Sequence, residues 1–157
     1  MGKVIDLQTR FWSKVDKEGP GGCWVWRANK VWGGYGHIRV GKRMILAHRI
    51  AYEFANGDIP DGKQIDHVCH NRSCVNPAHL RVASNKENAR NMLLRSDNTS
   101  GFKGVSFCKP LCRWKASLRK DGKDYYLGLY DTAEDAQRAY CEAAKKLFGE
   151  FYHDGVK

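Results

Sequence analysis

Hydrophobic and polar residues follow two different periods along the chain, and the period predicts the type of each element. In the first half, apolar residues recur at helical spacing over residues 7–15 and 48–56, and Gly57 would end the second helix. Residues 23–49 between them are rich in Trp, Val and Ile and are interrupted by glycines. This stretch therefore predicts two or three short antiparallel strands.

The middle of the chain has a strand–loop–strand–helix pattern. Residues 64–68 and 80–83 are the predicted strands, and a tight loop joins them. Ser84 and Glu87 have the spacing of a capping box, in which the two side chains satisfy backbone N–H groups at the start of a helix. A helix is therefore expected to follow the second strand and to end near residue 95.

The second half follows a polar segment and changes in pattern. Asp121-Gly122 has the composition of a two-residue hairpin turn. Thr132 begins a stretch whose apolar residues recur at helical spacing as far as Gly149, which predicts one amphipathic helix. Three strands are predicted before it, over residues 102–107, 113–120 and 124–130.

These patterns place the chain in the α+β class, as two small domains. Residues 1–96 are expected to form the first domain and residues 97–101 a linker. Residues 102–157 are expected to form a three-stranded antiparallel sheet packed on one helix. Domains of this size bury little apolar surface, so a metal ion is expected to stabilise the first.

A formal net charge of +10 adds a polyanionic partner to this picture. Nucleic acid is expected rather than a membrane, because the chain has no long apolar run and no basic amphipathic helix. The first residues lack the apolar core of a secretory signal, so a cytoplasmic location is expected.

The charge is concentrated on one predicted strand of the second domain. Period-two alternation puts Arg113, Lys115 and Arg119 on one face and Trp114 and Leu118 on the other. Such a face is often only solvated, but this one carries a single sign of charge. A small sheet also fits the major groove of double-stranded DNA. The predicted DNA-contacting residues are Lys103, Lys109, Arg113, Lys115, Arg119, Lys123 and Tyr125.

Cysteine and histidine gather in the loop between the two middle strands. Cys69, Cys74 and His79 offer three soft ligands from one loop, and zinc takes four in a tetrahedron. Cys23 is the upstream candidate for the fourth ligand, and His70 is the alternative to His79. Without a metal these cysteines would be buried thiols. The other cysteines are expected to be thiols rather than a second metal site with His153: Cys108, Cys112 and Cys141.

Asp66 and His67 stand together at a predicted strand end, and Asn88 lies on the helix that follows. Phosphodiester hydrolysis needs a base that activates water and a divalent cation at the scissile phosphate. His67 can serve as the base, while Asp66 and Asn88 offer hard oxygen ligands to one Mg²⁺ or Mn²⁺. Each residue alone would be unremarkable in a protein, but the three together predict a catalytic site.

Residues 66–88, DHVCHNRSCVNPAHLRVASNKEN, resemble the HNH (His-Me finger) nucleases, and most closely the zinc-containing His-Cys box homing endonucleases. The resemblance implies a ββα-metal fold and gives the three catalytic candidates the same roles. His79 stands where many HNH enzymes carry the middle Asn, which favours the zinc-containing branch. The resemblance also suggests Arg39 as the residue that stabilises the transition state, with Arg49 and Arg43 as alternatives.

Four short motifs of the second half match a second family: FKGV at 102–105, RWKA at 113–116, YLGLY at 126–130 and TAEDA at 132–136. They resemble the Apetala-type (ethylene-response-factor-like) DNA-binding domain, which reads the major groove with its sheet. Together the two resemblances predict a site-specific, homing-type, Mg²⁺-dependent DNA endonuclease of a phage-infected or bacterial cell. It is expected to nick as a monomer, or to cut both strands as a homodimer.

A different class of function also fits part of the sequence. A zinc-stabilised transcriptional regulator without catalysis would explain the cysteines and the basic sheet, but it would have no use for Asp66, His67 and Asn88 together. An RNA-binding protein is less favoured because no aromatic stacking platform is evident.

Overall fold

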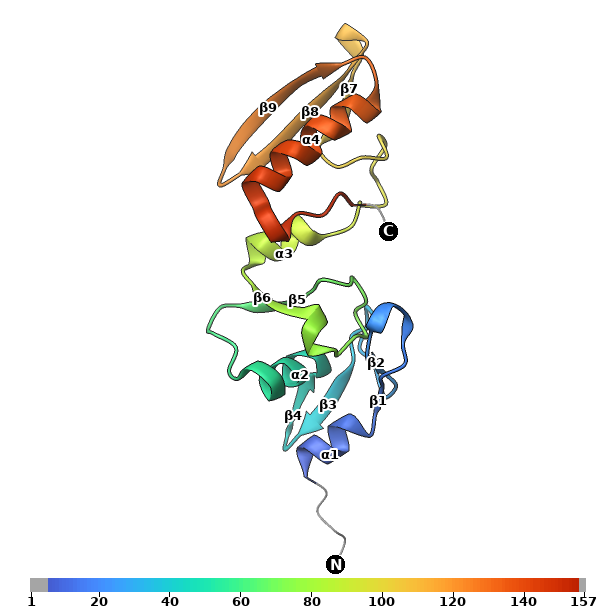
Figure 1. Ribbon diagram of the computed structural model, residues 1–157, viewed down its shortest axis with the longest axis vertical. Coiled ribbons are helices and arrows are strands. Elements are labelled where there is room, and N and C mark those ends of the chain that lie inside the picture. Colours follow the sequence, from blue (N-terminus) through green and yellow to red (C-terminus); the bar gives the residue numbers. More distant parts are fainter. Residues whose placement is uncertain (1–5, 156–157) are drawn as a thin grey trace, which may run out of the picture. The chain divides into compact units, whose positions relative to one another are not determined.

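The computed structural model describes residues 6–155 and divides the chain into two compact units, Met1–Asn85 and Lys86–Lys157 (Figure 1). Both mix helices with small antiparallel sheets, which confirms the α+β class. Within residues 6–155, no helix has the length and apolar character that a bilayer crossing requires.

The first unit contains three two-stranded antiparallel sheets, β1-β2, β3-β4 and β5-β6. Helix α2 packs against the last of these and against β4. The elements in chain order are α1 (Leu7–Trp12), β1 (Val15–Asp16), the 3₁₀ helix η1 (Pro20–Gly22), β2 (Val25–Trp26), β3 (His37–Val40), β4 (Arg43–Leu46), α2 (Ala47–Asn56), β5 (Gln64–His67), η2 (Pro77–His79) and β6 (Leu80–Ala83).

Aromatic side chains form the core of the first unit. Phe11 and Trp26 are fully buried, and their ring centroids lie 5.0 Å apart. Asp6 caps α1 by accepting the backbone N–H of Gln8 at 2.8 Å. The helix ends at Trp12 instead of residue 15, because Val15 pairs with Trp26 in the β1-β2 ladder. Tertiary pairing thus overrides the helical pattern.

The second unit is a three-stranded sheet, ordered β7-β8-β9, with one long helix across one face (Figure 1). Asp121 and Gly122 both have positive φ (51° and 83°), as the predicted two-residue hairpin requires. The predicted cap and end of the long helix are also present, at Thr132 and Gly149. The elements are α3 (Asn85–Asn91), β7 (Val105–Cys108), η3 (Lys109–Leu111), β8 (Arg113–Lys120), β9 (Lys123–Tyr130), α4 (Ala133–Phe148) and η4 (Gly149–Phe151).

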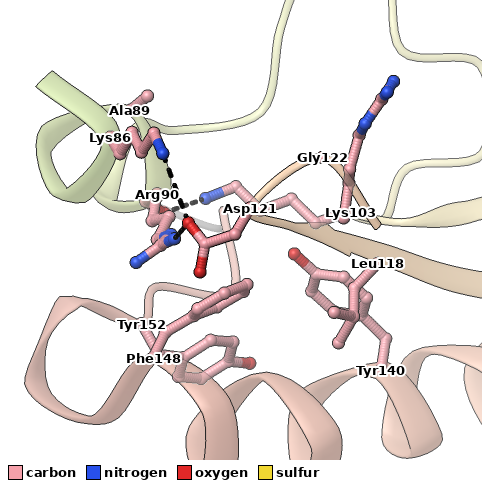
Figure 2. A pocket seen from close by; sticks show the side chains of 11 residues that line it. Lys86, Ala89, Arg90, Lys103, Leu118, Asp121, Gly122, Tyr140, Phe148 and Tyr152 are labelled. Atoms are coloured by element: carbon pink, nitrogen blue, oxygen red, sulfur yellow. Dashed lines mark hydrogen bonds and ion pairs between the residues drawn. The ribbon is translucent and has the colours of Figure 1, made fainter. Parts of the chain in front are cut away.

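Nearly all of helix α3 belongs to the second unit, where it lines a pocket of about 400 Å³ together with the β8-β9 turn and α4 (Figure 2). The guanidinium of Arg90 lies 3.9 Å from the carboxylate of Asp121 and 4.5 Å from the ring centroid of Phe148. Lys103 Nζ donates to the Arg90 carbonyl at 3.2 Å. The helix ends at Asn91 rather than near residue 95, and the following backbone is anchored to the C-terminal segment by hydrogen bonding.

Candidate metal centre and active site

Four predicted zinc ligands come together in the first unit. The ligand atoms of Cys23, Cys69, Cys74 and His79 all lie within 4.8 Å of one another. His79 Nδ1 is 3.6 Å from Cys23 Sγ and 3.7 Å from Cys74 Sγ. Sulfur and nitrogen ligands at the corners of a zinc tetrahedron lie roughly 3.5 Å apart, so the donor set has suitable spacing for such an ion.

The group combines two segments that are far apart in sequence. Cys23 follows η1, whereas the other three residues lie on the loop that joins β5 to β6. Backbone hydrogen bonds join the segments: Val75 donates to Trp24 at 2.7 Å, and Trp26 donates to Ser73 at 2.8 Å. This pairing brings Cys23 to the loop, as the sequence predicted.

The protonation of the cysteines also favours a cation. The Cys69 thiol donates a hydrogen bond to the sulfur of Cys74, which lowers the pKa of Cys74 to about 4 and raises that of Cys69. The backbone N–H of Asn76 donates to the same Cys74 sulfur at 3.4 Å. A stabilised thiolate is the form of cysteine that binds metals.

The alternative ligands lie elsewhere. His70 is not part of the group of four, and it adopts a positive φ of 56° just after the first loop cysteine. The remaining cysteines are free thiols outside this group: Cys108, Cys112 and Cys141.

His67 ends strand β5 and is buried, with 6 % of its surface exposed. Its Nε2 lies 3.0 Å from the carbonyl oxygen of Cys74 and donates to it. In the neutral ring Nδ1 is then the basic nitrogen. Burial lowers the pKa of His67, while the hydrogen bond to Cys74 acts in the opposite direction. The ring is therefore neutral at pH 7 and able to accept a proton.

Asp66 lies beside His67 and pairs across the ladder with Arg81 on β6. Nε and Nη2 of Arg81 both donate to Asp66 Oδ2, at 3.0 and 2.9 Å. Both side chains are shielded from water. The arginine thus fixes the orientation of this carboxylate at the end of β5.

Two aromatic neighbours of His67 were not singled out by the sequence. His48, in the first turn of α2, has its ring centroid 4.7 Å from that of His67, and Tyr35 lies 5.9 Å from it. Burial lowers the pKa of His48 to about 3, so this ring is also neutral. A histidine at the start of an amphipathic helix was the only available signal for His48, and such a residue is usually part of the core.

The remaining candidates lie away from this cluster or in the other unit. Arg39 is exposed on β3 and lines a separate hollow with Arg10 and Lys14. The arginine whose charge lowers the pKa of His67 is Arg72, which the sequence did not suggest. Asn88 lies on α3, in the second unit, whereas Asp66 lies in the first. Its role as a metal ligand stays a prediction.

The sheet of the second unit has the predicted basic face. Arg113, Lys115 and Arg119 are exposed, whereas Ala116 and Leu118 between them are buried under α4. The guanidinium groups of the two arginines lie 3.0 and 3.5 Å from exposed aspartates. Exposed ion pairs contribute little stability, so DNA binding by these two arginines stays a prediction that the pairs would not oppose strongly.

Two of the predicted DNA-contacting residues occupy other positions. Tyr125 pairs with Leu118 on the helix-covered face, whereas Tyr126 pairs with Ser117 on the basic face. A register shift at Ala116/Ser117 causes this exchange, and strand period alone does not reveal it. Lys103 faces inward: its Nζ donates to carbonyl oxygens within the unit, and burial lowers its pKa.

Two family models match separate parts of the chain. Residues 46–90 match the family model described as HNH endonuclease, and residues 100–150 match the AP2 domain model. Protein 3.8 of Escherichia phage T7 is 36 % identical over 104 residues, which are 66 % of this chain and 85 % of the relative. The chain belongs to the HNH endonuclease family. The AP2 domain forms its C-terminal part.

Two further relatives are similar to part of this chain. An uncharacterized HNH endonuclease of Acanthamoeba polyphaga mimivirus is 32 % identical over 105 residues, which are 66 % of this chain and 54 % of that protein. An AP2-like ethylene-responsive transcription factor of Arabidopsis thaliana is 43 % identical over 51 residues, or 32 % of this chain and 10 % of that protein. No solved structure matches the chain significantly. The HNH match contains Asp66, His67 and Asn88.

Proposed function

We propose that this HNH endonuclease is a site-specific, homing-type enzyme that cuts double-stranded DNA with one Mg²⁺ or Mn²⁺ ion and His67 as general base. The observation that carries the proposal is the fixed, neutral imidazole of His67 beside Asp66. The relative in a bacterial phage supports action in the cytoplasm of an infected host cell.

The residues divide the chemistry between them. His67 Nδ1 accepts a proton from the attacking water, and the Cys74 carbonyl keeps the ring in the required tautomer. Asp66 and Asn88 would hold the divalent cation, which would supply positive charge at the scissile phosphate. The cluster of Cys23, Cys69, Cys74 and His79 would hold zinc, which would stabilise the loop that carries the carbonyl partner of His67.

The arginine that stabilises the transition state is assigned by comparison of two variants. Arg39 is the sequence-based candidate, and Arg72 is the residue whose charge acts on His67. Arg39→Ala and Arg72→Ala should differ in cleavage rate, and the arginine that contacts the developing charge is the one whose loss costs about a hundredfold or more.

A cleavage assay on supercoiled plasmid tests the proposed function. With Mg²⁺ or Mn²⁺, the protein should convert plasmid of suitable sequence to the relaxed circle before the linear form, because a monomer with one active site cuts one strand at a time. His67→Ala should bind DNA normally and lose cutting by at least about a hundredfold, since general-base catalysis contributes 10²–10⁴.

His37→Ala, which alters a half-buried histidine of the same unit, is the control and should cut normally. Intact plasmid across divalent metals and diverse sequences would contradict catalysis and favour the DNA-binding regulator. Undiminished cutting by His67→Ala would instead reject this residue as the base.

A further inference from the structure

A rigid turn in the first unit presents an unprotected indole to solvent. Trp32 is fully exposed (101 %), and the adjacent Val31 is 41 % exposed. The other four of the chain's five tryptophans are buried or half-buried. An indole is among the most costly apolar surfaces to leave in water, so its position at a tip points to a binding role.

Hydrogen bonds hold the turn in shape. Lys30 pairs with Gly36 across an isolated β-bridge, and the N–H of Val31 donates to the Tyr35 carbonyl at 2.8 Å. Gly34 N–H donates back to the Val31 carbonyl at 3.0 Å. Such a closed turn cannot fold its tip onto the protein surface, so Trp32 stays available to a partner.

The turn is anchored beside the candidate active site. Arg72 Nη1 donates to the Gly33 carbonyl at 3.2 Å, and its guanidinium lies 5.4 Å from the ring centroid of Tyr35. Tyr35 in turn contacts His48 and His67, with centroid distances of 5.5 and 5.9 Å. The exposed indole is therefore three residues from a ring that touches the proposed base.

The charges around the turn that carries Trp32 indicate which partner binds there. Lys30 and Arg72 are both exposed and flank the turn, and the first unit carries 13 basic against 7 acidic side chains. A purely apolar partner would not need these cations, whereas DNA offers phosphates to them and base faces to the indole.

We propose that Trp32 is a DNA-contacting wedge that stacks on or inserts between bases next to the phosphate to be cut. The proposal rests on the proposed function for the location of the scissile phosphate. Apolar side chains that insert between base steps unstack and kink the duplex. Stacking tolerates any base, so the turn distorts the DNA at the cutting site while the AP2 sheet provides sequence reading.

Tryptophan fluorescence with acrylamide as quencher tests the contact directly. A random-sequence 40-base-pair duplex is added in EDTA-free buffer with Ca²⁺ in place of Mg²⁺. In the wild type, DNA should reduce the quenching of tryptophan fluorescence by acrylamide, because Trp32 supplies most of the emission that the quencher can reach. Trp32→Phe should lack this DNA-dependent change, while Trp12→Phe, which alters a half-buried ring, should retain it.

Cleavage of plasmid supplies the second measurement. Trp32→Ala should cut about tenfold more slowly, and Trp32→Phe, which keeps an aromatic face, should cut nearly as fast as the wild type. Met44→Ala, which removes another exposed apolar side chain of the same unit, should cut normally.

The outcomes separate this proposal from the proposed function. Unchanged acrylamide quenching on DNA addition, or a change that persists in Trp32→Phe, overturns the wedge. Protection that rises with protein concentration without DNA also overturns it, because it indicates contact with a second copy of the chain. DNA protection of Trp32 in a protein that never cuts DNA would keep the contact and reject only the endonuclease function.

Discussion

Two buried histidines in contact define the environment of the proposed base. His48 and His67 lie with ring centroids 4.7 Å apart, and burial lowers the pKa of both. His48 Nδ1 is buried without a hydrogen-bond partner, so a proton there would be poorly solvated. The pair thus keeps positive charge away from His67 and leaves its ring in the neutral form that general-base catalysis needs.

The buried His48 predicts a loss of stability in acid. Its pKa is about 3 in the folded chain and about 6.5 when unfolded, so the unfolded state binds a proton that the folded state excludes. Protonation of His48 in the unfolded chain therefore leaves the free energy of unfolding intact above about pH 6.5 and lowers it progressively as pH falls toward 3. Between pH 7 and pH 5, the free energy of unfolding measured in urea should fall by about 2 kcal/mol less in His48→Phe than in the wild type.

The comparison is made at one fixed zinc concentration, so that protonation of the cysteine ligands affects both proteins equally. A wild type and variant that lose stability in parallel would show that His48 is protonated in the folded state.

Among the elements, the loop between β5 and β6 is the one whose conformation is expected to depend most on a bound metal. Only the short η2 interrupts it, and its turns are held by side chains such as Asn71, whose Oδ1 accepts the N–H of Ser73 at 3.1 Å. Asn76 Nδ2 joins it to the Gly22 carbonyl at 2.7 Å. Backbone hydrogen bonds of Val75 to Trp24 and of Trp26 to Ser73 add to these contacts, so a bound metal is expected to act together with them in positioning the loop.

Zinc removal is therefore predicted to unfold the first unit while sparing the second. Metal analysis of the purified chain should find about one zinc per chain. Structural zinc contributes on the order of 10 kcal/mol in small zinc domains, so a chelator should abolish the thermal transition of the first unit. Cys23→Ser should bind zinc weakly, and Cys112→Ser, at an exposed cysteine outside the group, should bind it normally. A metal content near zero in folded protein would contradict the proposed site.

The sequence predicted most elements and the grouping of the four candidate metal ligands, because both depend on local patterns and on ligand chemistry. It placed Cys23 with three candidate ligands more than forty residues away, and the structure brings the four side chains together. What it missed depends on tertiary contacts: the early end of α1, the contact of His48 with His67, and the register shift that exchanges Tyr125 for Tyr126. None of these has a signal in the period of the chain.

For the molecule as a whole, both units are positively charged. The first has 13 basic and 7 acidic side chains, and the second has 14 and 10. The same polyanion can therefore attract the HNH part and the AP2 part. Within the second unit, strand β8 presents basic side chains on the open face of the sheet, whereas helix α4 carries acidic and basic side chains in equal number. DNA is thus expected to approach the sheet and not the helix.

The salt dependence of binding measures this orientation. Arg113→Ala should weaken DNA binding and reduce the slope of log K against log salt concentration by about 0.9, the value for one lost phosphate contact. Arg138→Ala removes an exposed arginine on α4 and should leave the slope nearly unchanged. Equal slopes for the wild type and Arg113→Ala, in filter-binding or anisotropy titrations, would argue against the basic face.

Helix α3 limits how this protein can be recombined with others. The HNH family match runs through Arg90, but that residue packs on Phe148 and lies near Asp121 in the second unit. A chimera that replaces the AP2 part after residue 96 would separate α3 from these partners. A domain exchange should therefore be joined before α3, so that the helix keeps its partners. Otherwise the new domain must supply an aromatic ring and a carboxylate that contact Arg90.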